Sequence, residues 1–358
     1  HKAEAATSAR SGNRWLFYGT GDGVKTMAIT VGLDVGAKSV EWVFRESGKN
    51  SKAERIVQSP QGHAELIKRL KALSPACVVM EATGIYYLDL AVALHGAGLP
   101  VSVINPKSFK HFATLKLAQA KTDAQDAGLL AEFGERMTPV LWSPPEAQRL
   151  ALRDIGRQIN RLIAARTQAK NRLHALQSKQ MTMPLLIEDE REGIVLLDRR
   201  IGRLEQAALT LIQQDEILHR QLQHLCTAKG IAHSSGIAIL GEFCVLPSHL
   251  KAPQVSRYAG LDVRVCQSGT SVNRPGRLSK AGNAYLRSAL YMPAMSAIQW
   301  DARAKAFYKA LVARGKKKMQ ALCAVMRKYL TGLWACIHDD VPFDSSKLFS
   351  DIHLNACS

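Results

Sequence analysis

The chain has 358 residues, 47% of them hydrophobic, which is enough for two or three domains with buried cores and excludes a disordered protein. Lys and Arg number 48 against 30 Asp and Glu, so the formal net charge is +18 and the pI is near 9.7. This excess favours nucleic acid as a partner, ahead of an anionic membrane surface or a protein that is merely basic. No apolar run approaches the roughly 18–20 residues that span a bilayer.

The first 26 residues lack the continuous apolar segment of a signal peptide. The strand and helix patterns of a domain begin at Met27, so we expect residues 1–26 to be an appended tail outside the fold. The seven cysteines are scattered and form no CxxC pair, which favours reduced thiols in a cytoplasmic protein.

Strand and helix patterns alternate over residues 27–143. Short apolar or alternating runs predict strands in "MAITVGLDVG", "SVEWVFRE", "ACVVMEATG" and "PVSVINP". Helical spacing appears in "HAELIKRLKAL" and "YLDLAVALHGAG". The alternation predicts an α/β domain with a largely parallel sheet.

A proline-rich stretch at 138–148 marks a boundary, and heptad-like patterns follow over residues 144–225. Apolar residues recur every three or four positions from Leu152 to Leu176 and again from Ile194 to Leu211, with Pro184 between the two runs. The pattern predicts two long helices that form a coiled-coil hairpin or a dimer arm. Two amphipathic helices of an ordinary bundle would give the same pattern, and both interpretations stay open.

The segment from residue 226 to 345 begins with "AKGIAHSSGIAILGEF", where two Gly-containing turns between apolar helices resemble a worn helix-hairpin-helix. A Ser/Thr/Gly loop, a basic segment and a helix follow. We therefore expect a mainly α domain that contains the serine loop, ahead of a tail at 346–358.

Four carboxylates stand where they could meet. Asp34 and Glu81 each close a predicted strand, and the carboxyl ends of neighbouring strands are where α/β sheets bind ligands. Asp123 and Asp126 are three residues apart and share one helix face. Oxygen ligands suit Mg²⁺, and two such ions about 4 Å apart can promote attack at a phosphodiester. A turn or cap role is the alternative for each Asp, whereas an unpaired Glu81 would be costly to bury.

Ser268 is a second candidate, in "QSGTSVNRPGRLSKAGNAYLR". A serine that attacks a phosphodiester needs exposure and nearby positive charge. The cations that follow are Arg274, Arg277, Lys280 and Arg287. An ordinary turn-forming loop is the alternative, and chemistry alone does not separate Ser268 from Ser271 or Ser279.

The stretches "VGLDVGAKSV", "VVMEATGIYY", "VSVINPKSFKHF" and "KTDAQDAGLLAEF" resemble the DEDD transposases of the bacterial insertion-sequence-110 family. That family includes Piv-type DNA invertases and bridge-RNA-guided recombinases. The resemblance resumes at "YAGLDVRVCQSGTSVNRPGRLSKAGNAYLRSALYMPAM" and covers nearly everything from residue 29 to about 345.

The resemblance implies an RNase H-like (RuvC-like) amino-terminal domain, a helical coiled-coil middle and a mainly α carboxy-terminal transposase domain. It implies a catalytic, Mg²⁺-binding tetrad of Asp34, Glu81, Asp123 and Asp126, with Ser268 as the nucleophile that forms a transient phosphoserine link to DNA. The serine and the acids would form a composite site, with different subunits as one possible source. Thr122 would cap the helix that carries the last two acids, and Lys121 would contact a phosphate.

The expected function is therefore that of a DNA transposase or recombinase of an insertion sequence. Its expected partners are the double-stranded DNA of the element ends and the target, a guide RNA as in some relatives, and further copies of the chain in a dimer or tetramer. No membrane partner is expected, and the expected location is the bacterial cytoplasm at the nucleoid.

The sequence leaves several alternatives open. A RuvC-like nuclease or Holliday-junction resolvase would use the four acids and leave Ser268 idle, and a site-specific DNA invertase would share the whole site. "GLDVGAKS" also resembles the first phosphate loop of actin-like ATPases and sugar kinases. A non-catalytic nucleic-acid-binding protein would need none of the acids.

Overall fold

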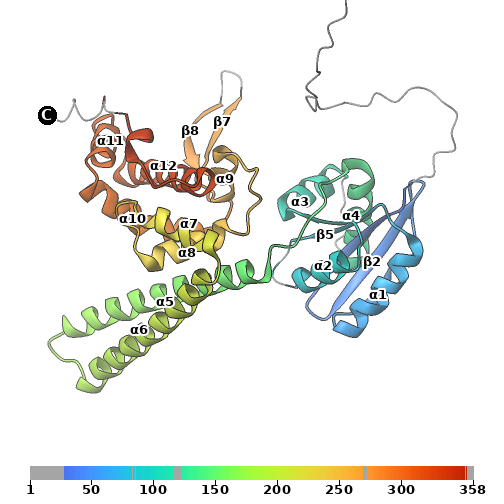
Figure 1. Cartoon of the computed structure of the whole chain (residues 1–358), viewed down its shortest axis with the longest axis horizontal. Coiled ribbons are helices and arrows are strands. Elements are labelled where there is room, and N and C mark those ends of the chain that lie inside the picture. Colours follow the sequence, from blue (N-terminus) through green and yellow to red (C-terminus); the bar gives the residue numbers. More distant parts are fainter. Residues whose placement is uncertain are drawn as a thin grey trace, which may run out of the picture. The chain divides into compact units, whose positions relative to one another are not determined.

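The computed structural model describes residues 28–82, 84, 86–116, 122–268, 272–350 and 352, and within 265–275 it describes only the backbone of the strands. The chain divides into two compact units between Pro144 and Pro145 (Figure 1).

The first unit is built on one sheet. Its strands are β1 (Thr30–Val35), β2 (Ser39–Glu46), β3 (Lys49–Asn50), β4 (Glu54–Val57), β5 (Cys77–Glu81) and β6 (Val101–Ile104). They follow the order β3-β2-β1-β5-β6, and β4 also pairs with β2. The four strands predicted from the sequence are present, while β3 and β4 were not predicted.

The sheet is mixed, so the prediction of a largely parallel sheet is wrong. β5 is parallel to both β1 and β6, whereas β2 is antiparallel to β1, β3 and β4. The connections explain the difference: three residues join β1 to β2, and Ser47 and Gly48, both with positive φ, turn β2 into β3. Links this short allow only antiparallel pairing, whereas parallel neighbours need a crossover. This strand order, with an antiparallel half and a parallel half, is that of an RNase H-like fold.

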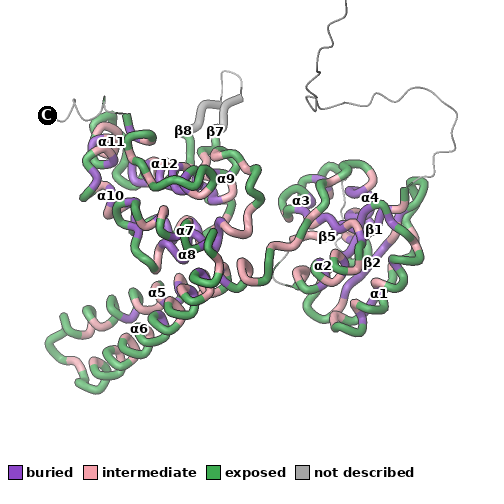
Figure 2. The backbone as a smooth tube through the Cα atoms, viewed as in Figure 1, coloured by how far each residue is buried: buried purple, intermediate pink, exposed green. Residues whose placement is uncertain are grey.

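Helices cover both faces of this sheet. They are α1 (Pro60–Leu73), α2 (Tyr87–Gly96), α3 (Pro106–Leu115) and α4 (Asp123–Met137). Val31 and Leu33 of β1 pack in one buried cluster with residues of α1 and α2. Val79 of β5 packs in another with residues of α3 and α4. The burial in Figure 2 follows this layering, with the strands buried and the outer sides of the helices exposed.

The second unit begins with two long helices, α5 (Ala147–Gln177) and α6 (Pro184–Gln213). They run antiparallel, since Arg166 pairs with Asp198 and Arg172 with Glu190. Pro184 is the first residue of α6, where its missing N–H costs nothing. The helical hairpin predicted from the heptads is therefore present, and its supercoiling stays a prediction.

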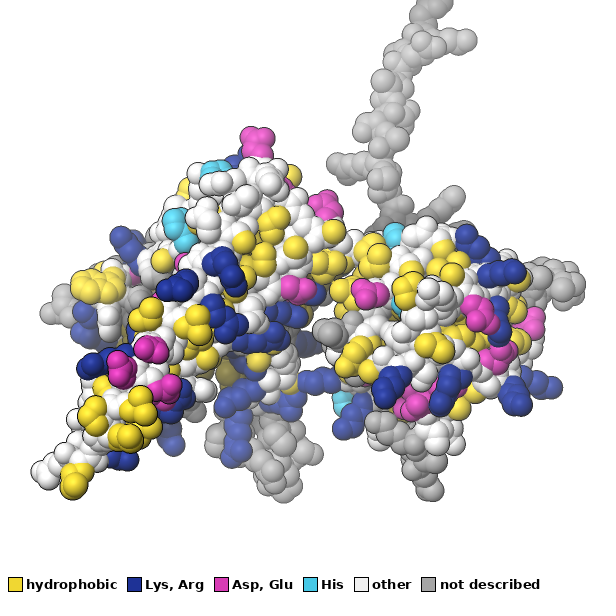
Figure 3. All heavy atoms as spheres, turned by 90° about the horizontal axis from the view of Figure 1, so that it is seen from below, with side chains coloured by type: hydrophobic (Ala, Val, Ile, Leu, Met, Phe, Trp, Pro, Cys, Tyr) yellow, Lys and Arg dark blue, Asp and Glu magenta, His cyan; other side chains and the backbone are white. Residues whose placement is uncertain are grey.

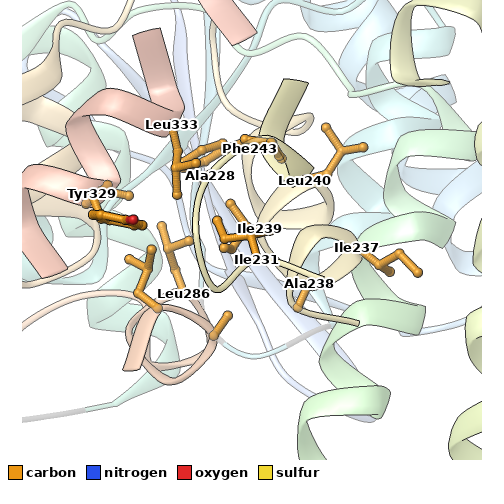
Figure 4. Close-up of a cluster of buried hydrophobic side chains, with 14 of the residues drawn as sticks. Ala228, Ile231, Ile237, Ala238, Ile239, Leu240, Phe243, Leu286, Tyr329 and Leu333 are labelled. Carbon is orange, nitrogen blue, oxygen red and sulfur yellow. The ribbon is translucent and has the colours of Figure 1, made fainter. Parts of the chain in front are cut away.

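The rest of the second unit is mainly helical. Its elements are α7 (Glu216–Cys226), α8 (His233–Phe243), α9 (Ala252–Tyr258), β7 (Val263–Ser268), β8 (Val272–Leu278), α10 (Ala284–Trp300), α11 (Ala302–Ala313), α12 (Lys318–Asp339) and the 3-10 turn η1 (Ser345–Lys347). One core joins α7, α8, α10 and α12 to the N-terminal half of α5 and the C-terminal half of α6 (Figure 4). Phe349 is fully buried in this core, so the packed unit reaches beyond residue 345, where the sequence predicts a tail.

Two predictions for this unit are corrected. Only one of the two expected Gly turns exists: Gly230, with φ of +89°, lies between α7 and α8, whereas Gly236 is inside α8 against Leu222. The expected Ser/Thr/Gly loop is largely a two-stranded antiparallel ribbon, β7–β8. The Gly, Pro and Ser residues of this stretch are typical of turns, and they obscured the strands.

Among the described residues, no helix is long and apolar enough to cross a membrane. Five cysteines are free thiols: Cys77, Cys226, Cys244, Cys323 and Cys336. Burial raises the pKa of Cys77 and of Cys336 to about 11, so both are inert structural residues at neutral pH.

Candidate active site

Asp34 and Glu81 lie at the ends of two adjacent parallel strands. Leu33 of β1 is in register with Met80 of β5, and each is followed directly by its acid. Both carboxylates are half-buried. The two strand ends that carry these acids therefore lie side by side in the sheet.

Helix α4 packs directly on the sheet face that carries these two acids. The hydroxyl of Thr30 donates to the carbonyl oxygen of Ala131 at 2.9 Å. A Cβ on Gly32 would lie 2.0 Å from the carbonyl oxygen of Ala127, so the absent side chain lets helix and strand touch. Since side chains alternate along a strand, Asp34 shares this face with Thr30 and Gly32.

The first turn of α4 lies level with the acid on β1. From Gly32 to Asp34 the strand advances about 6.6 Å, and from Ala127 back to Asp123 the helix advances about 6 Å. Asp126 belongs to the same turn and is half-buried, whereas Asp123 is exposed. The hydroxyl of Thr122 accepts from the backbone N–H of Gln125 at 3.3 Å, which confirms the predicted cap.

The fold thus brings the three elements that carry the four acids, β1, β5 and α4, to one end of the sheet. The side chains themselves are not gathered: within the described residues, no three or more His, Cys, Asp or Glu side chains are grouped closely enough to hold an ion. The donor set still fits a hard divalent ion, because all four side chains offer carboxylate oxygen. Lys121 lies outside the described residues.

Two charged residues at this site were missed by sequence reasoning. Glu41 of β2 is in register with Asp34, and Arg55 of β4 is in register with Glu41 and forms an ion pair with it. The alternation in "SVEWVFRE" held a signal, because it placed Glu41 on the face opposite the buried Val40 and Trp42. Arg55 could not be placed at the site from the sequence, because strand β4 was not predicted.

Ser268 is the last residue of β7, and its backbone is paired with Val272 of β8. Its side chain lies outside the described part of the chain. The base of the ribbon is anchored by Ser279, whose hydroxyl donates to Asp262 and whose N–H donates to the carbonyl oxygen of Asp262 at 2.9 Å. Ser279 therefore serves the structure of the ribbon. Ser271 is not described.

The cations predicted to contact phosphate differ in accessibility. Arg277 on β8 and Lys280 beyond it are exposed. Arg287 on α10 is half-buried and donates from Nη1 to the carbonyl oxygen of Ala259 at 2.8 Å, so part of its guanidinium holds the fold. The backbone of Arg274 lies opposite Cys266, and its side chain is not described.

A row of arginines on α5 was also missed. Arg149, Arg153, Arg157 and Arg161 recur every fourth residue and so share one side of the helix. Glu242, whose side chain is 1% exposed, anchors Arg157 through two hydrogen bonds of 2.6 and 3.0 Å. Arg161 is exposed and lies over the ring of Tyr285. Figure 3 shows Lys and Arg side chains spread widely over the face that it presents.

Comparison with known proteins adds to this geometry. The model of DEDD transposases of the IS110 type matches residues 31–179. The model of transposases of the IS116/IS110/IS902 family matches residues 222–309. The first match holds the four acids and the second holds Ser268.

Curated relatives agree with these matches. The pilin gene-inverting proteins of Moraxella bovis and Moraxella lacunata are each 31% identical over 296 residues, which cover 81% of this chain and 89% of theirs. An uncharacterized 42 kDa protein of insertion element IS900 from Mycobacterium paratuberculosis is 24% identical over 191 residues, 51% of this chain and 45% of its own. The structure of Thermus thermophilus RuvC in complex with a Holliday junction matches 32% of this chain and 99% of its own, at 20% identity and a TM-score of 0.26.

Proposed function

The chain belongs to the IS116/IS110/IS902 family of transposases, and from that premise we propose that it is a DNA recombinase that cuts and rejoins DNA with a Mg²⁺-binding carboxylate tetrad and a serine nucleophile. The observation that carries the proposal is the packing of α4 on β1 through Gly32, which brings Asp123 and Asp126 to the strand end of Asp34. Membership of a DNA-recombination family also removes the sugar-kinase alternative.

In this proposal Asp34, Glu81, Asp123 and Asp126 hold Mg²⁺. When bound, the ion would offset negative charge on the phosphate oxygens at the scissile position. The two strand-end acids are fixed by the sheet, while the two helix acids move only with α4. The cap at Thr122 orders the first turn of α4 and so limits where Asp123 and Asp126 reach.

The proposed nucleophile is Ser268. Its oxygen bonds to phosphorus as its proton leaves, and the bond from phosphorus to one deoxyribose oxygen breaks, so that a strand end departs as a hydroxyl. The phosphoserine ester keeps the energy of the broken phosphodiester, and attack by a hydroxyl of a second strand releases the serine. The accessible cations Arg277 and Lys280 would bind the flanking phosphates.

A second candidate function is site-specific DNA inversion by the same chemistry. The observation that favours it is the 31% identity to two pilin gene-inverting proteins over most of both chains. Transposition and inversion differ in which DNA ends are brought together, so they place the same demands on the residues of the site.

Further partners are part of the proposal. The basic net charge and the arginine row of α5 suit the phosphates of DNA, and of a guide RNA where one is used. The α5–α6 hairpin also exposes large apolar side chains, among them Leu185, Val195 and Leu196. We propose that these meet a second copy of the chain, and light scattering of a Leu185→Ser, Leu196→Ser variant would detect a lost dimer.

Strand exchange on a plasmid that carries the element with its native flanking DNA tests the function. We expect Mg²⁺-dependent exchange that is lost in Asp126→Asn and in Ser268→Ala and retained in Ser279→Thr, which keeps the ribbon hydroxyl. A Ser268→Ala variant that still exchanges strands would exclude the serine mechanism and leave a RuvC-like nuclease or resolvase.

A further inference from the structure

We propose that Arg55, oriented by Glu41, binds the DNA phosphate at the edge of the carboxylate site. This inference rests on the proposed function, because it assumes that DNA is cut at the tetrad. Arg55 is a phosphate-binding residue in this account, and Glu41 is a positioning residue.

The position of Arg55 follows from strand register. Asp34 on β1 faces Glu41 on β2, and Glu41 faces Arg55 on β4. Directly opposed side chains on neighbouring strands are about 4.5–5.5 Å apart at Cβ. The three residues therefore form one row across the sheet, on the face that α4 covers.

This row ends at the acid-bearing end of α4. Helix α4 contacts β2 from the same side, since Arg45 of β2 pairs with Glu135 at 2.6 Å. The hydrogen bond to Glu41 raises the pKa of Arg55, and the charge of Asp123 on the first turn of α4 raises it further. Arg55 thus lies within electrostatic reach of a residue of the tetrad.

Glu41 is buried and Arg55 is exposed, as expected for a cation that is held in place and accessible to a ligand. Glu41 is 8% exposed, whereas the side chain of Arg55 is 64% exposed. Glu41 accepts from Nε, one edge of the guanidinium. A guanidinium held at that edge keeps its terminal N–H groups for the two oxygens of a phosphate. The buried Glu41 thus holds the exposed Arg55 close to the four acids. Arg55 supplies positive charge where the negatively charged DNA must approach.

Arg69 of α1 provides a matched control, because it also pairs with a residue of the β2–β4 strand pair. It pairs with Glu54 of β4 and Glu65 of α1, and its side chain is 43% exposed. Glu54 and Glu41 belong to opposite faces of their strands, because Trp42, the partner of Glu54, packs in the cluster under α1 and α2. Arg69 is thus an exposed, doubly paired arginine on the sheet face away from the acids.

The experiment measures two quantities on Arg55→Ala, Arg55→Lys and Arg69→Ala in the full chain. The first is the single-turnover rate of DNA strand cleavage at saturating Mg²⁺. For Arg55→Ala we expect a loss of about 10–100-fold, since a donor to the reacting phosphate is removed. We expect Arg55→Lys to recover part of the rate and Arg69→Ala to match the wild type.

The second quantity is the Mg²⁺ concentration at the midpoint of the ion-induced rise in melting temperature, measured without DNA. Removal of a cation beside the acids strengthens their attraction for Mg²⁺, so this midpoint should fall in Arg55→Ala and stay unchanged in Arg55→Lys. A tetrad variant such as Asp123→Asn should raise it. If Arg55 had only a structural role, Arg55→Ala would lower the melting temperature and leave the Mg²⁺ midpoint unchanged.

The outcomes separate this inference from the proposed function. If the tetrad variants are inactive and Arg55→Ala cleaves at the wild-type rate, the phosphate contact is excluded and the proposed function stands. If the tetrad variants still cleave DNA, the proposed function is excluded, and the inference about Arg55, which rests on it, is excluded with it. Glu41→Gln keeps an acceptor for Nε, so it should lose less activity than Arg55→Ala, and an equal or larger loss would exclude the positioning role of Glu41.

Discussion

Glu132 on α4 is a carboxylate that is buried by the fold and neutralised by several cations. Lys116 donates to it at 2.9 Å and Arg136 at 2.6 Å, and Arg45 lies 3.9 Å away. Burial alone would raise the pKa of Glu132, but the hydrogen bonds from Lys116 and Arg136 outweigh it and lower the pKa below 4.5. These contacts tie α3, β2 and α4 together on the side of the sheet that carries the tetrad.

The lowered pKa predicts a pH dependence of stability. A depressed carboxylate contributes stability that is complete above its unfolded pKa and is lost as pH falls through its folded pKa. Glu132→Gln should therefore be less stable than wild type by about 1–2 kcal/mol at pH 7, with the gap closing below about pH 4. Urea unfolding from pH 7 to pH 3.5 measures this difference.

Glu65→Gln is the control for that experiment. Glu65 belongs to an exposed ion pair with Arg69, and such pairs contribute about 0–1 kcal/mol. A gap between Glu132→Gln and wild type that stays constant over the whole pH range would contradict the assigned role of the Glu132 charge.

Single residues also show how far position in the fold can be predicted from the sequence. Asp34 and Glu81 were predictable because each directly follows an apolar strand, and strand ends meet at one edge of the sheet. Glu41 and Arg55 were not, since they meet only through the register of β2 with β4, and no local pattern encodes which strands pair.

At the scale of elements, the contact between β1 and α4 sets where the first turn of α4 lies relative to β1. Gly32→Ala would place a methyl group 2.0 Å from a backbone oxygen of Ala127 and 2.3 Å from the backbone nitrogen of Ala131. Neither atom belongs to a flexible side chain, so helix and strand must separate. We expect a loss of about 3 kcal/mol or more in unfolding free energy, measured by urea unfolding of the variant.

Gly96→Ala is the matched control in the same unit. Gly96 ends α2, is exposed, and has no atom within 4 Å of an added Cβ. Gly96→Ala should leave the free energy of unfolding unchanged or raise it by up to about 1 kcal/mol. Equal stability of the two variants would contradict the close packing of α4 on β1.

The elements themselves were largely readable from periodicity. The strands β1, β2, β5 and β6 and the helices α1, α2, α5 and α6 follow patterns of period 2 or 3.6 that the sequence displays. The ribbon β7–β8 was not readable, because its Gly, Pro and Ser residues are typical of turns. Its strand character comes from the pairing of the two segments with each other.

At the scale of the whole molecule, the chain combines a carboxylate-bearing unit and a serine-bearing unit in a protein of net charge +18. The family was predictable because the sequence around each acid and around Ser268 is a local motif. The arginine row on α5 was not singled out, since charges on a helix face usually serve solubility alone.

The most direct test of the central claim is to trap the protein–DNA adduct and locate its bond. The full chain is incubated with Mg²⁺ and a plasmid carrying the element and its native flanks, quenched in detergent and digested, and the DNA-linked peptide is sequenced by mass spectrometry. We predict a phosphoserine ester at Ser268 that is absent without Mg²⁺ and absent in Asp126→Asn. An adduct on another residue, or strand exchange with no adduct at all, would contradict the account.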